Sequence, residues 1–154
     1  MLFRSAIILG LIAISIRYSI LWNSPEALWS EAARLAPHAV RPRIQLARAL
    51  PPERALEELQ NAPDTEQVFT EQGRLLLTLG RPAEALSAFG RALALTPNDA
   101  RAISNRAVAL AALGSREAAI AELQRALEKD PCLSDARDNL SKLGVQQQAP
   151  KSCH

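Results

Sequence analysis

The sequence predicts an all-α protein in which a single N-terminal transmembrane helix precedes a short stack of helix-turn-helix units. Three observations lead to this class. A unit of about 34 residues occurs twice between positions 66 and 133. Much of the 48% apolar fraction is Ala and Leu, a composition typical of helices rather than sheets. Residues 1–22 form an apolar segment that differs in kind from the rest of the chain.

The two copies of the unit, residues 66–99 and 100–133, carry the same residue at many equivalent positions. These pairs are Leu76 and Leu110, Leu79 and Leu113, Gly80 and Gly114, Ala85 and Ala119, Arg91 and Arg125, Ala92 and Ala126, Leu93 and Leu127, and Pro97 and Pro131. Except for the Arg pair, the identities fall where packing or chain reversal would require them. Two unrelated hairpins would not repeat a Gly, an Ala and a Pro in register, so we expect a duplicated structural unit.

Each copy is predicted to contain two helices. In the first copy, Asp64 or Thr65 can cap a helix over residues 66–79, and Gly80 can take the left-handed conformation that ends it. Pro82 suits the first turn of the second helix, where its missing amide costs nothing. The second copy repeats this plan with Asn98 or Asp99 as the cap, Gly114 at the turn and Pro131 at the end.

The order of residue sizes along each copy resembles the tetratricopeptide repeat. The matching residues are Phe69, Gly73, Leu76, Ala85, Phe89 and Pro97 in one copy and Ile103, Ala107, Leu110, Ala119, Leu123 and Pro131 in the other. Gln72 and Arg106 depart from the motif, which prefers Leu there. The resemblance implies a solenoid of stacked helix pairs whose concave side, lined by the first helix of each pair, holds peptides or partner helices.

The apolar N-terminal segment is predicted to be a retained membrane anchor. Its uncharged run, residues 5–16, would rise only about 18 Å as a helix against a bilayer core of roughly 30 Å. Extension to Trp22 gives about 27 Å, with Arg17 near the far end, where its side chain can reach the interface. A cleaved signal peptide is the alternative, and it would make the protein secreted. Its cleavage motif is poor and lies inside the apolar run.

The remaining parts of the chain complete the predicted solenoid, residues 23–144. They are a half repeat at 23–37, a shortened repeat at 40–63, a capping helix at 134–144 and a disordered tail at 145–154. Trp29 stands at the position of Phe89 in the full repeat, so we expect a core residue rather than a binding aromatic.

The membrane-proximal third carries a second resemblance. The stretch from Arg17 to Pro37, followed by Arg41-Pro-Arg-Ile-Gln-Leu-Ala, resembles the junction between the last membrane helix and the repeats of protein O-mannosyltransferase-like membrane proteins. The resemblance implies that the repeats lie on the periplasmic or extracytoplasmic side, whereas the positive charges around the span favour the cytoplasmic side. It does not carry the activity over, because one span offers none of the catalytic loops of those enzymes.

No catalytic, cofactor or metal site can be assembled from the sequence. Cys153 and His154 fall short of the set of ligands that a structural metal site needs. A disulfide between Cys132 and Cys153 can form in an oxidising compartment, although two cysteines prove no framework. The net charge of +2 argues against nucleic acid as the main partner. We therefore expect no enzyme, no cofactor and no small-molecule substrate.

What remains is a surface on the first helices of the two full repeats. Its predicted peptide-binding residues are Gln67, Thr70, Arg74, Arg101, Ser104 and Asn105. Asn105 stands where the family often has an Asn that hydrogen-bonds a bound peptide, and Arg74 and Arg101 can bind a carboxylate. The alternative is an ordinary solvated helix face. The sequence thus predicts a membrane-anchored adaptor for a protein or peptide partner, with an accessory part of a membrane glycosyltransferase system as the alternative.

Overall fold

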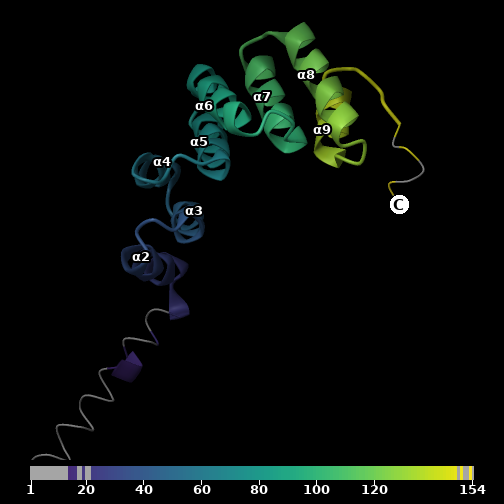
Figure 1. Ribbon diagram of the computed structural model, residues 1–154. Helices are drawn as coiled ribbons and strands as arrows, with labels where there is room; N and C mark the ends of the chain where they lie inside the picture. The colour runs from purple at the N-terminus through teal and green to yellow at the C-terminus, as the bar shows by residue number, and fades with distance from the viewer. Residues whose placement is uncertain (1–13, 17–18, 20–21, 149, 151–152, 154) are drawn as a thin grey trace, which may run out of the picture.

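The described part of the chain folds into consecutive helices and contains no strand. The computed structural model describes residues 14–16, 19, 22–148, 150 and 153. The helices are α2 (Pro25–Leu35), α3 (Val40–Ala49), α4 (Pro52–Gln60), α5 (Glu66–Thr78), α6 (Pro82–Leu95), α7 (Ala100–Ala112), α8 (Arg116–Lys129) and α9 (Ser134–Lys142). Neighbouring helices pack side by side in a curved stack (Figure 1). The predicted all-α solenoid is confirmed.

Local sequence signals set the helix boundaries of the two full repeats. Thr65 caps α5, since its hydroxyl accepts a hydrogen bond from the Val68 amide at 3.3 Å. Asp99 caps α7 in the same way through the amides of the first turn. Gly80 and Gly114 follow the ends of these helices with φ angles of +68° and +80°. A residue with a side chain is strained in this left-handed region, so glycine ends both helices.

Substitution by alanine should change the free energy of unfolding in opposite directions at a glycine in a turn and at a glycine inside a helix. Gly114→Ala places a side chain at positive φ and should lower the free energy of unfolding by about 1–2 kcal/mol. Gly90→Ala, inside α6, meets no atom within 4 Å and should raise it by roughly 0.5–1 kcal/mol. Urea unfolding of the two variants tests this. Equal effects from both substitutions would contradict the assigned turn.

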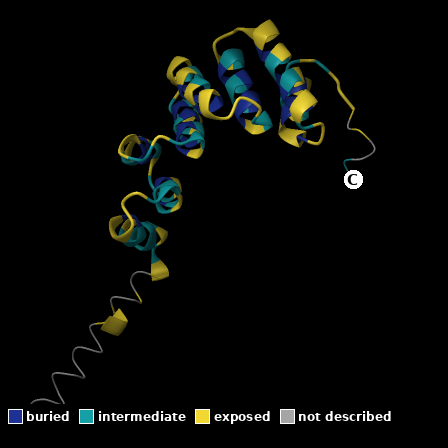
Figure 2. Cartoon of the chain, viewed as in Figure 1, coloured by how far each residue is buried: buried dark blue, intermediate teal, exposed yellow. Residues whose placement is uncertain are grey.

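The core lies between the facing sides of the helices (Figure 2). Phe89 on α6 is fully buried, and its ring fills the space above Gly73 on α5. A Cβ atom built on Gly73 would lie 2.5 Å from Phe89 Cε1, so only glycine permits this approach. In the second repeat Ile103 and Leu123 are buried in the corresponding helices, α7 and α8. The large and small residues of the repeat motif are therefore packing partners.

The repeated Arg pair has a structural role that the sequence did not indicate. The guanidinium of Arg91 lies 3.9 Å from the centre of the Phe69 ring and 3.5 Å from the Asp64 carboxylate. Arg125 donates a hydrogen bond to the carbonyl of Pro97 at 3.1 Å. Both arginines thus contact the chain at or just before the first helix of their own unit, although through different partners.

Helix α2 is less buried than the sequence predicts. Ala33 is its one buried residue, and Leu35 is 69% exposed. Trp29 was predicted to be a core residue but is only half-buried, beside a small cavity near Arg48. Among the described helices α2 packs on α3 alone, so none of the described helices covers the other side of its apolar stripe.

The predicted single-pass membrane location is wrong. In the described part of the chain, no helix is both long and apolar enough to cross a bilayer. Most of the predicted anchor, residues 1–22, lies outside the described residues; within it Ile14, Ile16 and Trp22 are 54%, 55% and 73% exposed. The physical reason is the charge of Arg17, which limits the uncharged run to about 18 Å of helix. The predicted periplasmic or extracytoplasmic placement depended on that anchor and falls with it.

A disulfide links the turn before the last helix to the C-terminal tail. Cys132, in the turn before α9, is bonded to Cys153, and their Cα atoms lie 5.3 Å apart. The Arg116 guanidinium also donates to the carbonyl of Leu143, which joins the start of α8 to the end of α9. The disulfide that the sequence left open is thus present, and it encloses the whole of the terminal helix.

A candidate peptide-binding groove on the odd-numbered helices

One face of the stack contains an elongated cavity of about 830 Å³. Its lining comes from α3, α5, α7 and α9 and from the turns that precede α7 and α9, so the odd-numbered helices form it and the even-numbered helices lie behind. Helices α3, α5, α7 and α9 each contact the next in this series. Consecutive helices reverse direction, so α5, α7 and α9 run the same way and present equivalent positions to the cavity.

All six residues predicted to bind peptide line this one cavity. They are Gln67, Thr70 and Arg74 on α5 and Arg101, Ser104 and Asn105 on α7. Gln67, Arg74 and Arg101 are exposed, whereas Ser104 is only 3% exposed. The structure therefore brings the predicted set together on one concave surface, and its contact with a ligand remains a prediction.

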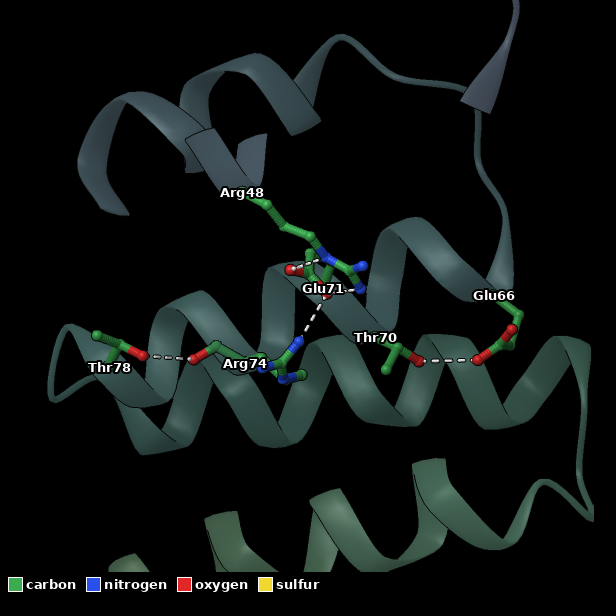
Figure 3. Close-up of polar contacts among 6 residues, drawn as sticks. All are labelled: Arg48, Glu66, Thr70, Glu71, Arg74 and Thr78. Carbon is green, nitrogen blue, oxygen red and sulfur yellow. Dashed lines mark hydrogen bonds and ion pairs between the residues drawn. The ribbon is translucent and has the colours of Figure 1, made fainter. Parts of the chain in front are cut away.

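A buried carboxylate in the cavity wall holds two arginines. Arg48 Nε and Nη2 donate to Glu71 Oε1 and Oε2 over 3.1 and 3.2 Å, and Arg74 Nη1 donates to Oε2 over 3.0 Å (Figure 3). The Glu71 side chain is 9% exposed, but those of Arg48 and Arg74 are 52% and 55% exposed. Two cations share one anion, so this cluster presents an excess of positive charge and unused N–H donors to the cavity.

The fixed geometry of this cluster also fixes its charge. Hydrogen bonding to Glu71, reinforced by charge attraction and opposed only in part by burial, raises the pKa of Arg48 above its usual value. Bidentate contact holds the guanidinium plane in one orientation. The donors that face the cavity are therefore positioned before a ligand arrives.

The polar residues of the cavity differ in whether they already have partners. The Thr70 hydroxyl donates to Glu66 Oε1 at 2.9 Å, so its proton is in use (Figure 3). Within the described part of the chain, the side chains of Arg101, Ser104 and Asn105 make no hydrogen bond or ion pair. These three on α7 are the groups most available to a ligand.

Sequence reasoning missed the residues that flank the predicted set. Arg48 lies on the shortened repeat, where no register links it to the full copies, and Glu71 is separated from it by 23 positions. The spacing of Glu71 and Arg74 by three residues was the available signal, since such positions share a helix face. Asp138 and Lys142, on the helix that the sequence predicts to be a cap, are exposed and line the cavity, because α9 lies beside α7 in the series of odd-numbered helices.

The fold and the groove define a helical-repeat protein of stacked hairpins. A sequence profile of the tetratricopeptide repeat matches residues 70–131. This chain therefore contains tetratricopeptide repeats, and the family resemblance is confirmed over that stretch. The match does not include residues 1–69, so the resemblance of the membrane-proximal third to the mannosyltransferase junction has no support.

Known proteins share parts of this chain. It is 39% identical over 80 residues to the TPR repeat-containing thioredoxin TTL4 of Arabidopsis thaliana. The aligned stretch covers 52% of this chain and 12% of that protein. The chain spans less than a third of the length of the curated relatives that it matches. The similarity thus concerns the repeat region and not the whole of those proteins.

Solved structures with the same fold cover more of the chain. MamA from Desulfovibrio magneticus RS-1 superposes with a TM-score of 0.67 at 25% identity, over 85% of this chain and 83% of that one. The first TPR of Spaghetti (RPAP3), solved bound to the HSP90 peptide SRMEEVD, superposes with a TM-score of 0.57 at 27% identity, over 60% and 77%. These similarities agree with a stack of tetratricopeptide hairpins.

Proposed function

We propose that this chain is an adaptor that holds a segment of a partner protein in the groove of its odd-numbered helices and performs no catalysis itself. The observation that carries the proposal is that one cavity collects all six predicted binding residues and leaves those on α7 without partners. The peptide bound to the first TPR of Spaghetti (RPAP3) supports it by analogy, since that domain has the same fold.

The cavity offers the two kinds of group that an extended peptide needs. Asn105 can both donate to and accept from a peptide unit, and the Ser104 hydroxyl can donate to a carbonyl. Arg101 can form a charge-assisted bond to an acidic side chain or a terminal carboxylate. Because Glu71 already orients Arg48 and Arg74, these two lose less conformational freedom on binding than mobile arginines would.

The proposal is tested with the double variant Arg101→Glu and Asn105→Ala. Both side chains lack partners in the described part of the chain, so the fold should persist, as circular dichroism can check. A hydrogen bond to a charged group is worth roughly 1.5–3 kcal/mol, so the Kd for a peptide selected by phage display on the full chain should rise at least about tenfold. Arg74 is the poorer target, because a carboxylate at that position would face Glu71.

The matched control is Lys129→Glu, the same reversal of charge at an exposed residue at the end of α8 that does not line the cavity. It should leave the Kd unchanged. If the double variant binds the selected peptide as tightly as the parent does, the groove is not the binding surface.

A further inference from the structure

The two ends of the groove differ in charge. At the end formed by α3 and α5, two arginines and two carboxylates line the groove. Arg48 and Arg74 share Glu71, whereas Glu66 at the start of α5 accepts from Thr70, so the excess positive charge is local to the cluster of Arg48, Glu71 and Arg74. At the end formed by α9, three carboxylates face one ammonium group. These residues are Asp130, Asp135, Asp138 and Lys142.

Most acidic residues in the groove have a structural role, which Asp138 lacks. Asp99 caps α7, Asp130 accepts from the Cys132 amide at 2.9 Å, and Asp135 lies in the first turn of α9, where a negative charge stabilises the helix. Asp138 lies one turn further along, where that benefit has fallen off.

No basic neighbour neutralises Asp138 among the described residues. Lys142 stands four residues later, the spacing of a helix ion pair, yet its Nζ donates to Asn139 Oδ1 at 3.3 Å instead. The adjacent Arg137 donates to the carbonyls of Pro131 and Cys132. Asp138 is thus an exposed carboxylate without a partner, and Asp135 on the same helix face adds repulsion.

A second, independent feature lies beside this acidic end. Ser104 on α7, the helix that contacts α9, is 3% exposed, lines the cavity and has no hydrogen-bond partner in the described structure. The small exposed part of Ser104 lies at the cavity, and its hydroxyl oxygen is not one of the fully buried atoms that lack a partner. Most polar groups of buried residues are hydrogen-bonded, so this accessible, unpaired hydroxyl is a place where a ligand atom can bind. Ser104 and Asp138 are separated by 34 positions, one repeat, and so occupy equivalent places on adjacent parallel helices.

We propose that the groove selects a peptide segment with two opposite charges: an acidic side chain that binds Arg48 and Arg74, and a basic side chain that binds Asp135 and Asp138. The inference rests on the proposed function and adds the charge pattern of the partner. Parallel neighbours among packed helices are roughly 8–10 Å apart, so α5 and α9 are separated by roughly 16–20 Å. An extended chain covers that distance in about five residues.

The test uses synthetic peptides on the full chain. The probe is an acetylated and amidated heptapeptide with Glu and Lys at its ends and five neutral residues between them, made in both chain directions. The comparison peptides have Gln in place of Glu, of Lys or of both, or Glu at both ends. Amide chemical shifts of the isotope-labelled protein give the Kd and the contacted residues.

Each end charge of the better-oriented probe should tighten binding about threefold, as partly exposed ion pairs do. Asp138→Asn should remove the gain from Lys and keep the gain from Glu, and Arg48→Gln should do the reverse. Glu57→Gln, an exposed carboxylate on α4 outside the cavity, is the control and should change neither.

The failures of the two proposals are distinguishable. If the peptides shift groove amides but the Kd values are independent of the end charges, or the peptide with Glu at both ends binds best, the charge pattern is refuted and the adaptor function stands. If none of the peptides shifts an amide on α5, α7 or α9, both proposals are refuted.

Discussion

Phe89→Ala is expected to lower the free energy of unfolding by about 3–5 kcal/mol, the largest effect of any substitution considered. Phe89 is fully buried and its ring occupies the space left by Gly73, so its removal opens a cavity between α5 and α6 that the helices cannot close without moving. Urea unfolding followed by circular dichroism measures the loss.

Substitutions at Gly73 test whether the loss of stability comes from the packing of Phe89 against this glycine. Gly73→Ala places a Cβ atom 2.5 Å from the Phe89 ring and should cost about 1–3 kcal/mol by overpacking. Combined with Phe89→Leu, it should cost less than the sum of the two single changes, because the smaller side chain makes room. Leu95→Ala on α6, 55% exposed, is the control and should change stability by less than about 0.5 kcal/mol. A loss below about 1 kcal/mol for Phe89→Ala would argue against this core.

Reduction of the disulfide between Cys132 and Cys153 should cost about 3 kcal/mol. The bond closes a loop of sequence separation 21 that contains all of α9, so its removal frees the unfolded chain and loosens the helix that covers the last repeat. The midpoint of urea unfolding with and without a reductant measures the effect.

A matched variant shows whether the reductant acts through this bond. The double substitution Cys132→Ser and Cys153→Ser should have the stability of the reduced protein and should not respond to the reductant. An unreduced protein that already titrates with two free thiols, or equal midpoints in both conditions, would show that the bond does not support the stack.

The repeat units were predictable from sequence because their signals are local. Gly80 and Gly114 end helices through a backbone conformation that other residues avoid, and Thr65 and Asp99 cap the helices that follow them. From the sequence, two neighbouring residues could cap each of these helices, since both have a suitable side-chain oxygen. The geometry of the turn selects one of them, and this geometry is not visible in residue identity.

Only the cavity residues on the two full repeats could be predicted, because the 34-residue period relates their positions. Gln67 and Arg101 are one repeat apart, so their common face followed from the period. Arg48 lies in a shortened hairpin whose register is shifted, and its contact with Glu71 is made in space between separate units. The acidic end on α9 was missed because that helix was assigned the role of a cap, whose polar side faces solvent.

The N-terminal prediction failed for a different reason. Hydropathy is averaged over a window of residues, so it does not register a single charge strongly. The predicted span reaches the bilayer thickness only if the apolar run is continued past Arg17. Helix α2, which follows this segment, is partly exposed for a related reason. Its apolar stripe resembles that of the second helix of a repeat, but among the described residues no first helix packs on it.

The most direct test of the adaptor account is site-specific cross-linking. A photoreactive amino acid is placed at Asn105, in the groove on α7, or at Ser87, on the exposed side of α6 outside the cavity, and each protein is illuminated with the peptide selected on the full chain. The account predicts a cross-link to the peptide from position 105 and none from position 87. A cross-link from position 87 alone would place the ligand outside the groove and contradict the account.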